Sequence, residues 1–196
     1  MTVKYGIRAA ALATIAVCGL TACGSESKPL SEEGVRQALL SERTLPDGWM
    51  LRHAPSMEDF AAGENRCRNE SGTKCPGFVA RGATGLEGVE IQPTGHGLIA
   101  GVGIVAFDTA ENAKAAFEGM ATEHKGGTAM EIRTGADQTV ASHGVLVPWE
   151  GTYTSHVTMH VGSTIVVISA GAKQPEDVTD LARYTADHVR KKLSEA

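Results

Sequence analysis

The sequence lacks most of the features by which enzymes and nucleic-acid-binding proteins are recognised. Aromatic residues make up only 5% of its 196 residues, and 18 basic against 23 acidic residues give a net charge of −5. An acidic chain without a basic patch argues against nucleic-acid binding. The sequence contains neither the G-x-S-x-G of serine hydrolases nor the H-E-x-x-H of zinc proteases. We therefore expect a protein that is not an enzyme and that holds no metal or other cofactor.

Histidine and glycine are more frequent, but their spacing gives no catalytic pattern. His156 and His160 share one face of an expected strand, where four residues span roughly 13 Å, too far to share one ion. The glycine-rich stretch from Gly95 to Gly103 lies in or before a strand, whereas a phosphate-binding loop follows a strand and opens a helix. Gly101 and Gly103 share one face of that strand. They indicate either the close approach of a helix or another backbone, or a shallow ligand cleft.

The N-terminus indicates export. Lys4 and Arg8 precede an uncharged run of about a dozen residues, the pattern of a secretory signal and too short for a membrane-spanning helix. Leu20-Thr21-Ala22-Cys23 then resembles the bacterial lipobox. The resemblance implies cleavage after residue 22 and attachment of diacylglycerol, with fatty acids such as palmitate, to Cys23. We expect a signal peptide over residues 1–22, a polar tether over 23–30, and a domain over 31–196 held at the outer face of the cell membrane.

Of the four cysteines, two remain for the domain itself. Cys18 would leave with the signal peptide and Cys23 would be lipidated, which leaves Cys67 and Cys75 as an even pair outside the reducing cytosol. No nearby histidine or cysteine has the spacing of further zinc ligands. We predict a disulfide between Cys67 and Cys75.

The order of the expected elements indicates an α+β domain with a mostly antiparallel sheet and packed helices. Residues 53–84 carry no clear periodicity and are expected to be a long polar loop. Three helices are expected. One begins at Ser31 and ends before Pro46, the second follows Asp108-Thr109, and the third follows Pro175. The expected strands cover Trp49–Leu51, Leu86–Gln92 with Val89 and Ile91 inward, Gly97–Phe107 at the centre of the sheet, Met130–Arg133, Val140–Trp149, Thr152–Val161 and Thr164–Ala170.

The last two strands give the clearest pattern. Apolar and polar residues alternate through Thr152–Val161, and Gly162-Ser163 form a two-residue turn that places Met159 opposite Val166. The other face is covered by the last helix, or it forms a groove. In the second case the candidate ligand-binding residues are Trp149, Thr154, His156, Thr158, Gly101 and Gly103.

Several stretches resemble one known family. "ALLSERTLPDGW" (Ala38–Trp49), "VAFDTAENAKAAFEGM" (105–120) and "TYTSHVTMHVGSTIVVISA" (Thr152–Ala170) are similar to the extracytoplasmic sensor-type domains of actinobacterial receptor Ser/Thr kinases and their lipoprotein relatives, the PknH-like extracellular domain family. The resemblance implies a sheet-and-helix sandwich with a central cleft for an extracellular ligand. The family's second disulfide is absent here, because "ATEHKGGTAM" (121–130) holds no cysteine.

We therefore expect a lipid-anchored extracytoplasmic binding or sensor-like module with an unidentified small-molecule ligand. The alternative is an interaction protein of the cell envelope that docks to another protein or to the cell wall through the 53–84 loop. In both cases the lipid anchor is the link to the membrane.

Overall fold

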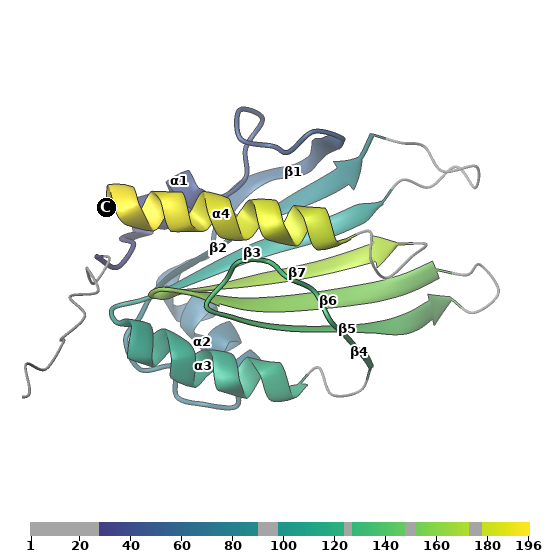
Figure 1. Ribbon diagram of the computed structural model, residues 1–196. Coiled ribbons are helices and arrows are strands. Elements are labelled where there is room, and N and C mark those ends of the chain that lie inside the picture. Colours follow the sequence, from purple (N-terminus) through teal and green to yellow (C-terminus); the bar gives the residue numbers. More distant parts are fainter. Residues whose placement is uncertain (1–27, 90–97, 124–126, 148–151, 173–177) are drawn as a thin grey trace, which may run out of the picture.

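The computed structural model describes residues 28–89, 98–123, 127–147, 152–172 and 178–196. Seven strands form one sheet in the order β1-β2-β3-β7-β6-β5-β4, and every neighbouring pair is antiparallel (Figure 1), which confirms the predicted α+β class. The elements are α1 (Glu32–Ala38), β1 (Trp49–Met57), α2 (Phe60–Ser71), β2 (Phe78–Gly88), β3 (Ile99–Phe107), α3 (Ala110–Glu123), β4 (Thr128–Met130), β5 (Gln138–Val147), β6 (Thr152–Val161), β7 (Thr164–Ala172) and α4 (Thr179–Glu195).

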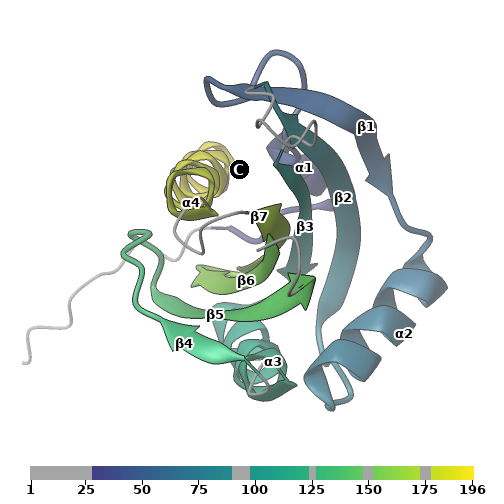
Figure 2. The same cartoon turned by 90° about the vertical axis from the view of Figure 1, so that its right-hand side faces the viewer.

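Helices lie on both faces of the sheet and give the domain three layers. Figure 2 shows α1 and α4 on one side of the sheet and α2 and α3 on the other. The main core lies beneath α1 and α4, where Ile104, Met159 and Ile168 of the central strands meet Leu181 and Val189 of α4. A smaller buried cluster lies beneath α2 and α3. The two faces of the sheet therefore differ in how much apolar surface they bury.

The hairpin of β6 and β7 has the predicted register. Met159 lies opposite Val166 and Val157 opposite Ile168, and all four side chains belong to the main core. Gly162 in the turn has φ +55°, a left-handed conformation that glycine adopts without steric cost. The strict alternation along β6 thus places its apolar residues toward α4.

The expected central strand and the helix after it are also confirmed. β3 lies between β2 and β7. The Thr109 hydroxyl accepts a hydrogen bond from the backbone N–H of Asn112 at 3.1 Å, which caps the start of α3. The apolar stripe of α3 is buried, namely Ala113, Ala116, Phe117 and Met120.

The first and last helices follow their expected patterns with shorter bounds. The Ser31 hydroxyl accepts from the Gly34 N–H at 3.1 Å, as expected of an N-cap, but α1 ends at Ala38, well before Pro46. The expected opening of the last helix at Pro175 lies outside the described residues, and α4 spans Thr179–Glu195. The residues of this segment that face the sheet are buried: Val178, Leu181, Ala182, Thr185, Val189 and Leu193.

The expectation of a loop over residues 53–84 is wrong. β1 continues to Met57, α2 follows, and β2 begins at Phe78. The Asp59 carboxylate accepts from the Ala62 N–H at the start of α2. The buried positions of α2 are Gly63, Cys67 and Ser71, so a stripe of small residues at four-residue spacing faces the sheet. Such a stripe carries no hydrophobic periodicity, which is why the sequence pattern did not indicate a helix.

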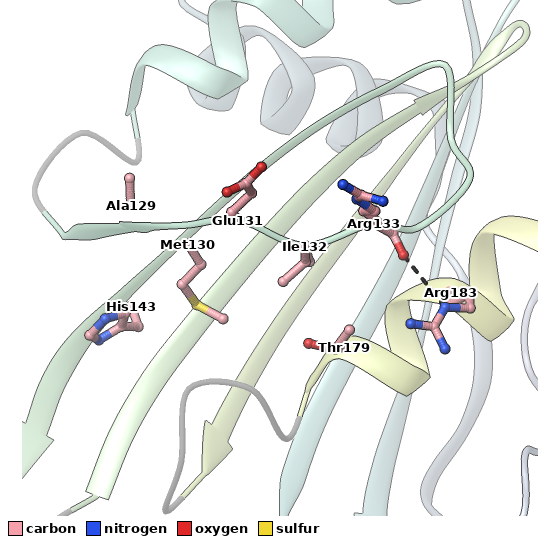
Figure 3. A pocket seen from close by; sticks show the side chains of 8 residues that line it. All are labelled: Ala129, Met130, Glu131, Ile132, Arg133, His143, Thr179 and Arg183. Carbon is pink, nitrogen blue, oxygen red and sulfur yellow. Dashed lines mark hydrogen bonds between the residues drawn. The ribbon is translucent and has the colours of Figure 1, made fainter.

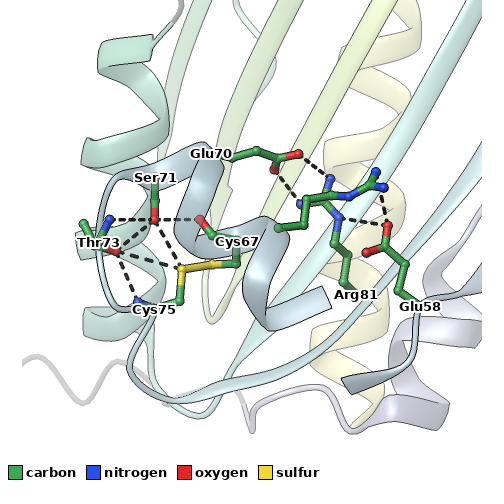
Figure 4. Close-up of polar contacts among 8 residues, drawn as sticks. Glu58, Cys67, Glu70, Ser71, Thr73, Cys75 and Arg81 are labelled. Carbon is green, nitrogen blue, oxygen red and sulfur yellow. Dashed lines mark hydrogen bonds and ion pairs between the residues drawn. A yellow bond between two sulfur atoms is a disulfide. The ribbon is translucent and has the colours of Figure 1, made fainter. Parts of the chain in front are cut away.

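Covalent and ionic contacts hold α2 in place (Figure 4). The predicted disulfide joins Cys67 of α2 to Cys75, and both residues are buried. The Arg81 guanidinium of β2 donates twice to the Glu70 carboxylate, from Nη1 at 2.5 Å and from Nη2 at 2.9 Å. The Nε of Arg81 also lies 3.4 Å from the Glu58 carboxylate. These contacts take the place of an apolar stripe.

Three strand bounds differ from the expectation. The strand expected over residues 86–92 ends at Gly88, so Val89 is 55% exposed instead of inward, and Ile91 lies outside the described residues. β4 covers Thr128–Met130 instead of 130–133, and β5 covers Gln138–Val147. The first half of β2 combines Phe78 and Val79 with small residues and Arg81, and this order gives weak alternation. In the described segments no helix combines the length and the apolar character needed to cross a bilayer.

Candidate functional site

The helices α2 and α3 cover only part of their face of the sheet. The Phe117 ring of α3 lies 6.0 Å from the His160 ring of β6 and shares a buried cluster with Val105 and Ile165. Figure 1 shows both helices near the end of the sheet where β6 turns into β7, while the strands continue past them. The expectation that the last helix covers this face of the hairpin is therefore wrong: α3 covers it, and α4 lies on the opposite face.

Exposure rises along this face with distance from the helices. In β7 the residues change from buried at Ile165 to half-buried at Val167 and exposed at Ser169, and in β3 they change from buried Val105 to exposed Gly101. The residues between them, which point toward α1 and α4, stay buried throughout. The sheet is therefore buried on one face and open on the other at this end.

The strand register brings most of the predicted binding residues together here. Gly101 pairs with Gly85 of β2 and with Ser169 of β7, and Ser169 pairs with His156 of β6. In the next row of this face, Gly103 and Thr158 both pair with Val167. We call this surface the open half-sheet and define it by Gly85, Gly101, Gly103, Thr154, His156 and Ser169.

The glycines leave empty space above the sheet. Among the described residues, a Cβ atom built on Gly101 meets no atom within 4 Å, and the same holds for Gly171 on the same face. A Cβ on Gly103 meets only backbone oxygens, at 3.8 and 3.9 Å, which is ordinary contact. The expectation of a helix or backbone in close approach to these glycines is thus wrong, and the alternative of a shallow ligand surface stands.

The open half-sheet offers hydrogen-bonding groups without formal charge. His156 Nδ1 and the Ser169 hydroxyl are hydrogen-bonded at 3.0 Å. The hydroxyl oxygens of Thr154 and Thr158 are buried and have no hydrogen-bond partner within the described structure. The His53 side chain of β1 lies directly beside Gly85 and borders the surface. A ligand here would meet hydroxyls, imidazoles and bare backbone.

The structure adds residues that the sequence reasoning missed. Ser169 follows from the confirmed hairpin register, because the same register that pairs Met159 with Val166 pairs His156 with Ser169. His53 lies in the segment that was expected to be a loop, and Gly85 lies between that segment and the strand expected from Leu86, so no pattern placed either residue. Trp149, the expected wall of the groove, and Cys23, the expected lipid attachment point, both lie outside the described residues.

Comparison with solved structures identifies the fold. The extracellular domain of PknH from Mycobacterium tuberculosis superposes with a TM-score of 0.60 at 15% identity, over 87% of this chain and 100% of that chain. The chain thus shares the fold of a receptor-kinase extracellular domain. An uncharacterised Mycobacterium smegmatis protein, the Rv0999 ortholog, covers 84% of this chain and 98% of its own at 14% identity, with a TM-score of 0.44. No family model and no curated protein sequence matches the chain.

The shared fold confirms the resemblance that the sequence indicated, at the level of the fold. At 15% identity no residue role passes from one protein to the other. Within the described residues no group of three or more histidine, cysteine, aspartate or glutamate side chains could hold a metal ion. What the chain binds must therefore be argued from its own surfaces.

Proposed function

We propose that the protein is a lipid-anchored extracytoplasmic sensor-like module that binds its ligand on the open half-sheet and performs no chemical step. The observation that carries the proposal is the row Gly85–Gly101–Ser169–His156, in which the bare position Gly101 lies between Gly85, which the His53 side chain covers, and two hydrogen-bonded side chains. The shared fold with the extracellular domain of PknH supports the sensor-like character. The signal-like N-terminus and the lipobox support the location.

The chemistry of the surface favours a neutral, polar and flat ligand. Bare glycines let a ring or an extended chain lie against the backbone, and hydroxyl and imidazole groups supply donors and acceptors. None of the six defining residues is an aspartate, glutamate, lysine or arginine. A saccharide of the cell envelope has matching properties, whereas a strongly charged ligand would find no counter-charge among these six residues.

The former alternative, docking through a 53–84 loop, loses its support. That segment consists of β1, α2 and β2, and it is held by a disulfide and by the Arg81 ion pairs. A rigid, cross-linked part of the sheet does not provide the long adaptable loop on which the docking interpretation depended.

The proposal can be tested by filling the open half-sheet. Gly101→Leu adds a side chain where a Cβ meets open space, so the fold should be kept while ligands are excluded. Soluble peptidoglycan fragments and envelope oligosaccharides would be screened by thermal shift, in which ligand at 100-fold its Kd adds about 2.7 kcal/mol of stability. Ala115→Leu, which adds the same side chain at an exposed position of α3, is the matched control. A hit that binds Gly101→Leu and the control equally would refute the site.

The lipid anchor has a separate test. Cys23→Ala removes the thiol that the lipobox would modify, and without acyl chains, each buried CH₂ of which contributes about 0.8 kcal/mol, the protein should leave the membrane fraction. Cys18→Ala is the control, because Cys18 lies upstream of the expected cleavage point. Complete membrane association of Cys23→Ala would show that the lipidation proposal is wrong.

A further inference from the structure

A second hollow lies on the opposite face of the sheet, beneath the segment that joins β4 to β5. We call residues 131–137 the strap. Two arginines of α4 hold it: Arg183 donates from Nε to the Arg133 carbonyl at 3.5 Å, and Arg190 donates to the Gly135 carbonyl. Asp137 accepts from the Gly162 N–H at 2.7 Å, which ties the end of the strap to the β6–β7 turn. The strap is therefore fixed at several points.

The strap, the edge of the sheet and the start of α4 line an open pocket of about 580 Å³. Pockets for small organic ligands have volumes of about 300–1,000 Å³. Figure 3 shows Met130 and Ile132 pointing from the strap side into the space toward α4, while Glu131 and Arg133 point away from it. The side chains that reach into the space from the strap side are therefore apolar, although Glu131 and Arg133 also line the pocket.

The α4 end of the pocket is positive. Thr179 and Arg183 line it. The N-terminal residue before α4, Val178, supplies no side-chain cap, so the first-turn N–H groups are not capped by a side chain there. A helix start carries partial positive charge, and Arg183 adds a full charge one turn later. Arg183 is half-exposed and holds Asp180 through Nη1 at 3.2 Å, so its remaining nitrogen can point to a ligand.

The other end of the pocket holds His143 of β5. Its ring packs edge-on against the Tyr153 ring, with centroids 5.7 Å apart, and its Nδ1 is buried without a hydrogen-bond partner in the described structure. An unpaired buried ring nitrogen is costly, because it has lost its water without gaining a protein partner. A ligand atom in the pocket would relieve that cost.

We propose that this pocket binds a small carboxylic acid with an apolar body. The carboxylate lies between Arg183 and the first turn of α4, and the apolar body lies against Met130 and Ile132 with its far end near His143. Apolar walls, one cationic end and a helix start together match such a ligand, and they match neither a cation nor a neutral sugar. The site is separate from the open half-sheet, which lies on the other face of the sheet.

The first experiment compares simple probes by titration calorimetry on the purified protein. Octanoate combines a carboxylate with an apolar chain, octylamine carries the opposite charge, and acetate has no apolar body. Octanoate should bind at one site, at least about tenfold more tightly than either of the others, because charge-assisted hydrogen bonds and apolar burial both contribute. Equal binding of octylamine, or no binding of octanoate, would overturn the proposal.

Two variants locate the carboxylate. Arg183→Gln removes the cation and should weaken octanoate binding about tenfold or more. Thr179→Glu places a carboxylate in the first turn of α4, where the helix dipole stabilises it, so the fold should remain intact while octanoate is repelled. Since both changes act at the pocket, octanoate binding that survives both would refute the placement.

Arg190→Gln is the matched control. Arg190, like Arg183, pairs with an aspartate three residues earlier, bonds a strap carbonyl and is about half-exposed, but it does not line the pocket. The Arg190→Gln variant should bind octanoate as tightly as the unaltered protein does. Equal losses in both arginine variants would mean that the strap position matters and not a contact with the ligand, which overturns the assignment. Gly101→Leu should leave octanoate binding unchanged, because Gly101 lies on the other face of the sheet. The pocket proposal can therefore be refuted without refuting the open half-sheet, and the reverse also holds.

Discussion

Removing the disulfide between Cys67 and Cys75 should lower the free energy of unfolding by about 2.5 kcal/mol. The bond joins residues eight positions apart, and the chain-entropy model gives roughly this value for a closed loop of that length. Both cysteines are buried and no apolar stripe holds α2, so the bond is one of its few strong attachments. The free energy of unfolding of a domain of this size is about 5–15 kcal/mol, so the loss is a large fraction of the total stability.

The assay is urea unfolding of the unaltered protein and of the Cys67→Ala/Cys75→Ala double variant, followed by circular dichroism. The double variant should also melt about 5–10 °C lower, since a loss of 1 kcal/mol lowers Tm by about 2–4 °C at this chain length. Thiol titration of the unaltered protein after oxidative folding should detect neither Cys67 nor Cys75. Two reactive thiols there, or a double variant as stable as the unaltered protein, would refute the reasoning about α2.

Three further predictions concern single buried groups. Arg81→Leu should cost about 2 kcal/mol in urea unfolding, because it leaves the partly buried Glu70 carboxylate without its partner and Glu58 with Arg66 alone, and a cost near zero would contradict this account. Thr158→Val replaces a buried hydroxyl that has no partner and should stabilise the fold by about 1 kcal/mol, measured by calorimetry. Burial, and then the charges of Lys192 and Lys191, lower the pKa of His188. The folded state therefore binds this proton more weakly than the unfolded chain, so stability should fall as the pH drops below about 6.5, and His188→Gln should reduce that fall.

The sequence predicted those elements whose apolar residues repeat with one clear period. β6 and β7 alternate with period two, and α3 and α4 carry apolar stripes at helical spacing, so their positions and facing residues follow directly. α2 could not be predicted in this way, because its inward residues are glycine, cysteine and serine and its attachments are a disulfide and ion pairs. Such contacts depend on partners distant in the sequence, such as Arg81 with Glu70, and leave no local period.

The candidate site was predictable only in part for a related reason. Thr154, His156 and Thr158 share a face by simple alternation, and Gly101 and Gly103 share a face of β3. These two faces form one surface only because β3 pairs with β7. The two strands are separated in the chain by α3 and three strands, so the sequence does not indicate that they pair. The pocket beneath the strap was missed altogether, since it joins residues of β4, β5 and α4 that have no common motif.

The central strand β3 shows how one sheet can be stable and still present an open surface. Ala100 and Val102 are buried beneath α1 and α4, whereas Gly101 between them is exposed on the opposite face. Among the described residues, no atom lies within 4 Å of a Cβ built on Gly101, so the packing contacts at this end of the strand lie on the other face. The core and the binding surface are thus made by alternate residues of the same strand. Substitutions on the open face can change what the surface accepts while the core beside it stays unchanged.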